Sequence, residues 1–333
     1  MRQVLLFYVA MPALMACEAA HAQAYPVRPI RLIVASAPGG NPDLNSRNLA
    51  TELTRLLGQQ VVVENRPGAS GIIGFEALAR ATPDGYTIGY ISNLAATNPS
   101  LYAKLPYDFF RDFQPLLHYL SGLNVLTVNL SLPVRSVKEL IEHARANPGK
   151  LSYGTSGVGA SPHLSMELFK RMTNTNILHV GYKGSQQAIT DLIGGQIEVV
   201  ADNIGPLLPL LRAGRVRGLG VTALKRSPVL PDLPTLDEAG IPGYELTTWG
   251  GFAVPARVPR EIVVRLNAEI NKALQTPAVY QFLTGNSLTP EGGTPERFTE
   301  HVRKETEKLG KLDRKSTRLN SSHIPLSRMP SSA

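Results

Sequence analysis

The feature that most limits the fold of this chain is a strand pattern followed by a helix pattern, which recurs along most of its length. Residues 30–37, IRLIVASA, form an apolar run typical of a buried strand, and leucines between residues 49 and 57 then recur at helical spacing. The runs 59–66 and 71–82 repeat this order. Repeated units of this kind predict an α/β protein with mostly parallel sheets and helices on both faces.

Later parts of the chain carry the same alternation with recognisable helix signals. Ser136 and Glu139 have the spacing of a capping box, and Ser161 and Ser185 are predicted to cap two further helices. The Gly194-Gly195 pair is predicted to end the helix that begins near Ser185. Further helices are predicted at 259–274 and 294–309.

Size and charge set broad limits on function. At 333 residues the chain exceeds a usual single core, so two domains are expected. There are 34 basic and 26 acidic residues, a net charge of +8, but the basic residues form no dense block. We therefore expect a solvated basic surface and no nucleic-acid partner.

The first 24 residues have the pattern of an export signal. Arg2 precedes an apolar run at 4–16, and the small-x-small sequence Ala22-Gln23-Ala24 follows. We expect cleavage after Ala24 and a periplasmic protein. The alternative, a lipoprotein site at Cys17, is less favoured because Met stands second in LMAC.

Cysteine and histidine usage argues against a metal centre. Cys17 is the only cysteine of the chain, so cleavage after Ala24 would leave none for disulfides, thiolate catalysis or thiolate-bound metal. The seven histidines do not pair at metal-ligand spacing. We expect neither a metal nor a cofactor.

Three glycine-rich turns follow predicted strands and lead into predicted helices. They are residues 38–40 (PGG), 66–74 (RPGASGIIG) and 154–163 (GTSGVGASPH). Glycine lets backbone N–H groups approach a ligand, and a helix N-terminus favours negative charge. Because ligands in α/β sheets bind beyond the carboxyl ends of strands, the turns predict a cleft for a small anion.

Two sharper chemistries fit less well. No Lys-Ser or Lys-Thr pair follows a glycine loop, so a P-loop nucleotide site is not expected. Residues 154–158, GTSGV, nearly form a nucleophile elbow around Ser156, but Val158 occupies the last glycine position. A secreted serine hydrolase using Ser156 is therefore the alternative function, and a turn hydroxyl that donates to a ligand is the favoured role.

Several single residues have two readings each. Asp43 is expected to be the N-cap of the first helix rather than a catalytic acid, and His163 to be a polar pocket or packing residue. Asp202 could accept hydrogen bonds from a ligand amine or hydroxyl, or cap the helix after it. Trp249 is expected in the core, with a cleft wall as the alternative, and Lys183 is expected either to be exposed or to favour a nearby anion.

Residues 313–333 have a different composition from the rest of the chain. They contain six serines and show no helical or strand period, which predicts a disordered tail. The stretch RKSTRLNSSH resembles translated sequencing-adapter read-through, so we expect this tail to be artefactual and exclude it from functional reasoning.

Eight motifs, taken together and in order, carry a family likeness over about residues 25–310. Among them are YPVRPIRLIVASAPGGNPD, VVVENRPGASGIIG, LSYGTSGVGASPHLSMELFK, HVGYKGSQQAITDLIGGQIEVVADN and WGGFAVPA. They resemble the Bug family, the extracytoplasmic solute receptors of tripartite tricarboxylate transporters.

The resemblance implies a type II periplasmic binding protein, in which two α/β domains surround a ligand cleft and are joined by two crossovers. On that pattern the first domain comprises residues 25–123 and 222–312, and the second comprises 124–221. The crossovers are expected near 122–126 and 219–224. The protein is expected to be a monomer and not an enzyme.

The resemblance also implies a small carboxylate ligand, held partly through ordered waters, and membrane transporter subunits as partners. The matching positions are the expected ligand-binding residues, with Asp202 at the distal part of the ligand. They are Pro38, Gly39, Gly40, Asn41, Asp43, Gly68, Ala69, Ser70, Gly71, Ser92, Asn93, Thr155, Ser156, Gly157, Gly159, Ala160, Ser161, His163 and Asp202.

Overall fold

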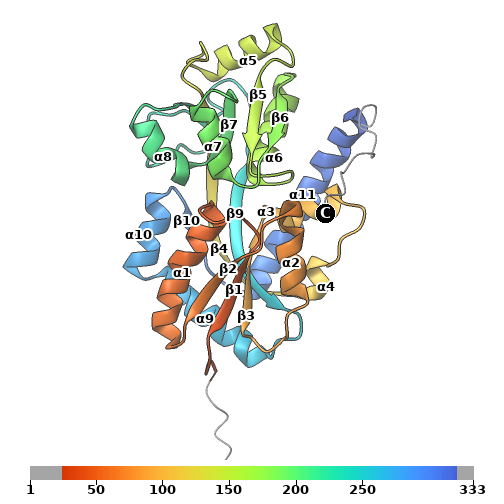
Figure 1. The fold of residues 1–333 in the computed structure, drawn as a ribbon, viewed down its shortest axis with the longest axis vertical. Helices are drawn as coiled ribbons and strands as arrows, with labels where there is room; N and C mark the ends of the chain where they lie inside the picture. The colour runs from red at the N-terminus through yellow and green to blue at the C-terminus, as the bar shows by residue number, and fades with distance from the viewer. Residues whose placement is uncertain (1–24, 321–333) are drawn as a thin grey trace, which may run out of the picture.

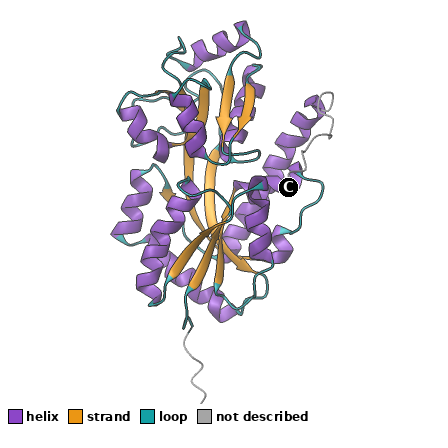
Figure 2. Cartoon of the chain, in the orientation of Figure 1, coloured by secondary structure: helices purple, strands orange, loops and turns teal. Residues whose placement is uncertain are grey.

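Two lobes stacked along the long axis make up the molecule, and long strands run between them (Figure 1). The computed structural model describes residues 25–320, with side chains as far as residue 308, so the predicted export signal lies outside the described residues. Helices lie on both sides of the strands in each lobe, as Figure 2 shows. The predicted α/β architecture with two units around a cleft is confirmed.

The strands form one continuous sheet that passes through both lobes in the order β2-β1-β3-β9-β4-β7-β5-β6. Lobe 1 contains β1 (Ile30–Val34), β2 (Val61–Asn65), β3 (Thr87–Ser92), β9 (Thr247–Pro255), β10 (Thr289–Pro290) and the first part of β4 (Phe113–Val128). Lobe 2 contains the rest of β4, β5 (Ser152–Thr155), β6 (Leu178–Gly181), β7 (Val199–Asn203) and β8 (Arg217–Val221).

The outer strands of each lobe are parallel, as predicted, but the central ones are not. β1 is parallel to β2 and β3, and β5 is parallel to β6 and β7. In contrast, β4 is antiparallel to β7, β8 and β9, and β9 is antiparallel to β3. The antiparallel pair β4 and β9 carries the chain between the lobes in opposite directions.

Helices cover the sheet in both lobes. Lobe 1 has α1 (Asn41–Leu57), α2 (Ile72–Ala79), α3 (Asn93–Leu101), α4 (Phe109–Asp112), α9 (Arg260–Leu274), α10 (Pro277–Gly285) and α11 (Pro295–Asn320). Lobe 2 has α5 (Val137–Ala146), α6 (Ser161–Thr173), α7 (Ser185–Ile193) and α8 (Ile204–Arg212). Ser136 does cap α5, but the N-cap positions of α6 and α7 are Ala160 and Gly184, one residue before the predicted serines, and neither has a side-chain capping hydrogen bond.

The first crossover lies where the sequence predicted it, and the second does not. On β4, pairing with β9 ends at Leu123 and pairing with β7 begins at Asn124. Residues 222–246 stay with lobe 2, because Leu236, Tyr244 and other side chains of this segment pack in its core. The second crossover is therefore at residues 246–247 and not near 219–224. The segment has no helix or strand period, so its burial was not visible in the pattern.

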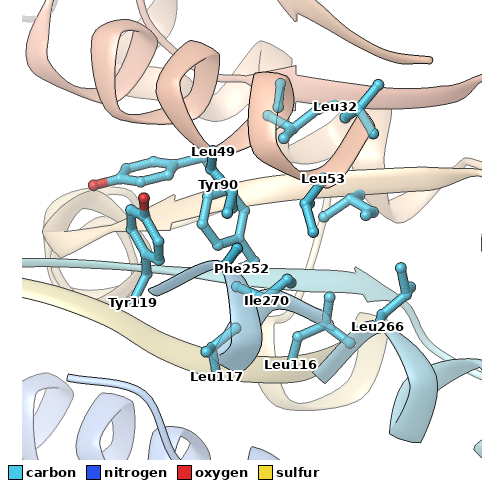
Figure 3. Packing of buried hydrophobic residues seen from close by; sticks show 14 of the residues in the cluster. Leu32, Leu49, Leu53, Tyr90, Leu116, Leu117, Tyr119, Phe252, Leu266 and Ile270 are labelled. Carbon is cyan, nitrogen blue, oxygen red and sulfur yellow. The ribbon is translucent and has the colours of Figure 1, made fainter. Parts of the chain in front are cut away.

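Each lobe has its own hydrophobic core. In lobe 1, leucines from α1 pack against Tyr90, Phe252 and the leucines of β4, together with Leu266 and Ile270 of the neighbouring helix α9 (Figure 3). In lobe 2, Tyr153, Phe169 and Tyr244 are fully buried together. Burying side chains of this size stabilises each lobe by about 2 kcal/mol per residue, before the entropy cost of ordering the chain.

The C-terminal helix is longer than predicted. α11 continues to Asn320, so the backbone of residues 313–320 is helical where the sequence predicted no regular structure. Residues 321–333 lie outside the described residues. In the described part of the chain, none of the helices combines the length and apolar character needed to span a bilayer.

Candidate ligand-binding cleft

Six helices begin at one cavity between the lobes, and each follows the carboxyl end of a strand. In lobe 1 the pairs are β1–α1, β2–α2 and β3–α3, and in lobe 2 they are β5–α6, β6–α7 and β7–α8. The N-cap residue of each of these helices lines the cavity: Gly40, Gly71, Ser92, Ala160, Gly184 and Asn203. The predicted arrangement at the strand ends therefore extends to six turns rather than three.

None of these six N-cap residues makes a side-chain capping hydrogen bond. By contrast, the helices α4 and α5, whose ends do not line the cavity, are capped by Asp108 and Ser136. The first N–H groups of a helix have no partner inside the helix. Six sets of such donors, each at the positive end of a helix dipole, make the cavity suited to an anion.

The cavity has a volume of about 660 Å³, within the range of small-molecule sites. Both lobes contribute to its lining. Lys183 is the only basic side chain, and Asp202 the only acidic one, among the described residues that line it. No group of three or more potential metal-binding side chains occurs among the described residues.

The structure places thirteen of the predicted site residues on the cavity wall and the other six behind it. The lining ones are Gly40, Asn41, Gly68, Ala69, Ser70, Gly71, Ser92, Asn93, Ser156, Gly157, Ala160, Ser161 and Asp202. Pro38, Gly39, Asp43, Thr155, Gly159 and His163 are absent from the lining and belong to the turns that support it.

Asp43 supports the first turn and is not the N-cap of α1. Gly40 is the N-cap, and Asp43 lies within the first turn of the helix. Its buried carboxylate accepts hydrogen bonds from Gly39 N at 2.9 Å, Arg47 Nε at 3.0 Å and Asn65 Nδ2 at 2.9 Å. Burial raises the pKa of Asp43, but these hydrogen bonds outweigh it and hold the pKa below its usual value. The carboxylate therefore fixes the shape of the turn before α1.

The second turn has an unusual backbone. Four successive residues, Gly68 to Gly71, have positive φ, including Ala69 at 46° and Ser70 at 51°. Side chains from α3 and the segment after it hold the turn, because Asn98 Nδ2 donates to Ser70 O and Tyr102 OH donates to Ser70 Oγ. Non-glycine residues with positive φ are uncommon and gather at functional sites. Sequence reasoning identified this turn by its glycines and gave no sign of the strain at Ala69 and Ser70.

Histidines buttress the third turn instead of activating Ser156. Thr155 Oγ1 lies 2.7 Å from His179 Nε2, and Gly159 N donates to His163 Nδ1 at 3.3 Å. The rings of His163 and His179 meet edge to face at 4.8 Å. Burial lowers the pKa of His163 to about 4, so this ring is neutral and its Nδ1 can accept a hydrogen bond. In the described part of the chain neither ring forms a hydrogen bond with Ser156, and the hydrolase alternative is unsupported.

Trp249 combines the two roles that the sequence left open. Its side chain is 1% exposed and packs in the core of lobe 1, yet the residue also lines the cavity. Trp249 N donates to Asn93 Oδ1 at 3.1 Å, and Nε1 donates to Glu305 Oε2 at 3.2 Å. The tryptophan therefore connects the cavity wall to α11.

Sequence reasoning missed several lining residues, four of which lie between residues 182 and 187, after β6 and at the start of α7. This segment lies at a strand end, like the three turns that were predicted, but it has a single glycine before its helix and gave a weaker signal. The missed lining residues include Ser36, Tyr90, Tyr182, Gly184, Ser185, Gln187, Asn203 and Thr248.

The lobes contact each other directly beside the cavity. Gln186 Nε2 at the start of α7 donates to Gly39 O at 3.2 Å, and Thr97 Oγ1 of α3 donates to Gly159 O at 3.1 Å. The hydroxyls of Ser227 and Ser287 lie 2.6 Å apart. The first two contacts join a supporting turn of one lobe to a helix of the other, as in a cleft that closes over its contents.

Comparison with known proteins agrees with this geometry. The chain is 37% identical over 278 residues to the protein BugT of Bordetella pertussis, covering 83% of this chain and 85% of BugT. The structure of Rpa4515 from R. palustris with adipate superposes with a TM-score of 0.84 at 39% identity, covering 87% of this chain and 98% of that one. MatC from Rhodopseudomonas palustris with bound malate gives 0.83 at 29% identity, covering 87% and 100%.

A family model covers the same region of the sequence. The model of the tripartite tricarboxylate transporter family receptor matches residues 46–317, which include five of the six strand–helix pairs at the cavity and nearly all of α11. The glycine-rich turns, the two-lobed sheet and these matches lead to one assignment. The chain belongs to the tripartite tricarboxylate transporter family of periplasmic solute receptors, which includes the Bug proteins.

Proposed function

We propose that this receptor captures a small carboxylate in the cavity between its lobes and delivers it to the membrane subunits of a tripartite transporter. The observation that carries the proposal is the convergence of six helix N-termini without side-chain caps on one cavity. The similar proteins with adipate and with malate support a carboxylate as the ligand.

Binding by this geometry needs neither a metal nor a catalytic base. Backbone N–H groups of Gly40 and its counterparts in lobe 2 donate to the carboxylate oxygens, and the helix dipoles add to the attraction. Closing the lobes removes water, which strengthens these hydrogen bonds. A closed form that ligand favours is then the form that a membrane partner can recognise.

The variant Gly40→Val tests this role of the turn before α1. Gly40 has φ −77°, and a Cβ there meets no atom closer than 3.5 Å, so valine adds bulk at the cavity wall without backbone strain. We expect binding of the best carboxylate to weaken at least about tenfold, since one set of donors is obstructed, while the melting temperature stays close to that of the wild type.

Gly285→Val is the matched control, because Gly285 ends α10 and a Cβ there meets no atom within 4 Å. Calorimetry and thermal melting of both variants give the comparison. Unchanged affinity in folded Gly40→Val would show that the first turn does not hold the ligand.

We also propose that the chain is exported, cleaved after Ala24 and active as a monomer. The charged start, the apolar run and the Ala22-Gln23-Ala24 sequence support the cleavage site. Intact mass and light scattering of the protein from the periplasm check both statements, and a mass that includes residues 17–24 with a lipid on Cys17 would contradict the cleavage site.

A further inference from the structure

Asp202 lines the cavity and has a buried carboxyl oxygen without a hydrogen-bond partner. The residue is the last but one of strand β7 and is 1% exposed. Its Oδ1 accepts two hydrogen bonds, from Asn203 N at 2.7 Å and from Asn203 Nδ2 at 3.2 Å, whereas Oδ2 has no hydrogen-bond partner. A buried polar atom without a partner is costly, so its partner is expected in the ligand.

The two oxygens of Asp202 fit the two halves of a neutral carboxylic acid. In the acid form one oxygen is a carbonyl that accepts, as Oδ1 does twice, and the other is a hydroxyl that donates. An ionised form would place a bare anionic oxygen in the wall of a cavity built for anions. No basic side chain forms an ion pair with Asp202 among the described residues.

The surroundings of Asp202 favour the neutral form. Burial raises its pKa more than hydrogen bonding with Ser185 and Asn203 lowers it, although Ser185 makes no hydrogen bond of ordinary geometry to Oδ2. Charged side chains among the described residues do not contribute to the shift. The titratable groups that share the cavity are Lys183, Tyr182 and Tyr90, and those on elements packed against β7 are His118, Tyr119, Tyr153, His163, Glu167, Lys170, Arg171, Asp191 and Arg212.

We infer that Asp202 binds the ligand as a carboxylic acid, its Oδ2–H donating a hydrogen bond to a second carboxylate of a dicarboxylate held between the lobes. This inference rests on the proposed function and adds to it the class of ligand and a proton. The helix N-termini hold one carboxylate, and Asp202 recognises the other. Receptor molecules with ionised Asp202 must take one proton from solvent before they bind.

If ligand binding requires protonated Asp202, the affinity for the ligand must depend on pH. Only the neutral form binds, so dicarboxylate affinity is highest at low pH and falls as pH rises above the pKa of Asp202 in the free receptor. Well above that pKa, the dicarboxylate affinity falls about tenfold for each pH unit. Measurements from about pH 6 to about pH 8 keep the ligand itself ionised, since its carboxyl groups titrate near pH 4 to 5.

The experiment is calorimetry on the refolded full receptor with paired probes of equal chain length, succinate with butyrate and adipate with hexanoate. Titrations in two buffers of different ionisation enthalpy measure the protons taken up on binding. Three variants accompany the wild type: Asp202→Ala, Asp202→Asn and the control Asp232→Asn, which makes the same change at an exposed loop residue. Thermal melting of each variant monitors folding.

The expected results separate the inference from its rivals. The wild type should bind a dicarboxylate at least about tenfold more tightly than its monocarboxylate pair, with proton uptake. Asp202→Ala should lose that preference, and Asp202→Asn, whose amide also donates, should regain much of the lost affinity but show no linked proton. Asp232→Asn should match the wild type in both respects.

Two outcomes would overturn the inference. If Asp202→Asn loses as much affinity as Asp202→Ala, the residue is an ionised acceptor for a ligand donor. If the wild type prefers no dicarboxylate, or releases a proton when it binds one, the acid form plays no part. If the receptor binds none of these probes and no other carboxylate, the proposed function itself is contradicted. If Asp202→Ala does not fold, the affinity of Asp202→Asn and the number of protons taken up by the wild type on binding still test the inference.

Discussion

Asp43 shows how a charged residue can shape a binding site without contacting its ligand. Three donors, from Gly39, Arg47 and Asn65, meet its two oxygens, and together they tie the turn before α1 to β2. The turn then presents the N-terminus of α1 to the cavity. The rigidity of the first donor set therefore depends on a carboxylate behind the wall.

Replacing Asp43 by asparagine should cost stability and affinity together. The asparagine side chain has an NH2 group at a position where the structure already supplies three donors. At least one hydrogen bond to a charged group is therefore lost, and one N–H donor is left facing another. We expect the free energy of unfolding to fall by about 2 kcal/mol, measured by urea denaturation, and ligand binding to weaken several-fold.

Asp237→Asn is the matched control, because Asp237 accepts a single N–H from Gly243 in an exposed turn. Asp237→Asn should lower the free energy of unfolding by less than about 1 kcal/mol and leave ligand binding unchanged. An equal loss in both variants would mean that the Asp43 network adds nothing to the first turn.

At the residue scale, the sequence predicts which turns meet the cavity better than it predicts what each side chain does. The strand–glycine–helix pattern placed Gly40, Gly71 and Ala160 correctly beside the cavity, because backbone geometry follows from local chemistry. The partners of Asp43 and His163 could not be read in the same way. Asn65 and His179 reach these sites only through the tertiary fold, whereas Arg47 lies one helical turn from Asp43 on α1, a local spacing that the sequence does show.

At the scale of elements, the helix N-termini are the functional parts of the molecule. A side-chain cap stabilises a helix by about 1 kcal/mol, and the six helices at the cavity begin without one. Their uncapped donors are then available to a ligand, so binding recovers stability that the empty receptor lacks. Helix periodicity predicted these elements, but the missing caps are visible only in the structure.

The helix α11 supports the cavity wall through a cluster of rings around Trp249. His301 of α11 stacks on His118 of β4 with ring centroids 4.2 Å apart, and both rings meet Trp249 edge to face. Burial lowers the pKa of each histidine to about 4. Both rings are therefore neutral at pH 7 and pack as aromatic side chains.

Acid should loosen this cluster. The folded-state pKa values of His118 and His301 lie below the ordinary 6.5, so the unfolded chain binds more protons between about pH 4 and 6.5. Stability from these groups is present above that window and is lost as pH falls through it. His301→Phe keeps a ring on His118 and removes a buried nitrogen without a partner. On acidification through this window, the free energy of unfolding of His301→Phe should fall by about 2 kcal/mol less than that of the wild type. Urea denaturation at each pH measures both values.

His143→Gln on α5 is the control, because it removes an imidazole from lobe 2, away from Trp249. The free energy of unfolding of His143→Gln should fall on acidification by the same amount as that of the wild type. The account of α11 would be wrong if His301→Phe showed an unchanged pH dependence.

At the scale of the whole molecule, function follows from two lobes that share one sheet. β4 and β9 connect the lobes, so three helix N-termini of each lobe face one cavity, and contacts such as Gln186 to Gly39 join the two walls. A ligand that bridges both sets of donors favours the closed arrangement. The affinity of the receptor therefore depends on lobe closure as well as on the donors.

The large-scale predictions succeeded where the sequence carried repeated local signals and failed where it did not. The family motifs and the strand–helix alternation indicated two units and the first crossover near Asn124. The second crossover was misplaced because residues 222–246 have irregular backbone, yet Leu236 and Tyr244 are buried in lobe 2. Burial of an irregular segment is a property of the tertiary fold and leaves no period in the sequence.

The measurement that tests the central claim most directly is calorimetric titration of the refolded receptor with carboxylates and with the matching amides. Adipate, malate and related acids are compared with amides of the same size, in the presence of a chelator. We predict saturable binding of at least one carboxylate and none of its amide, unchanged by the chelator, because the six uncapped helix N-termini select negative charge. Equal binding of acid and amide, or a cooperatively folded receptor that binds no carboxylate, would contradict the account.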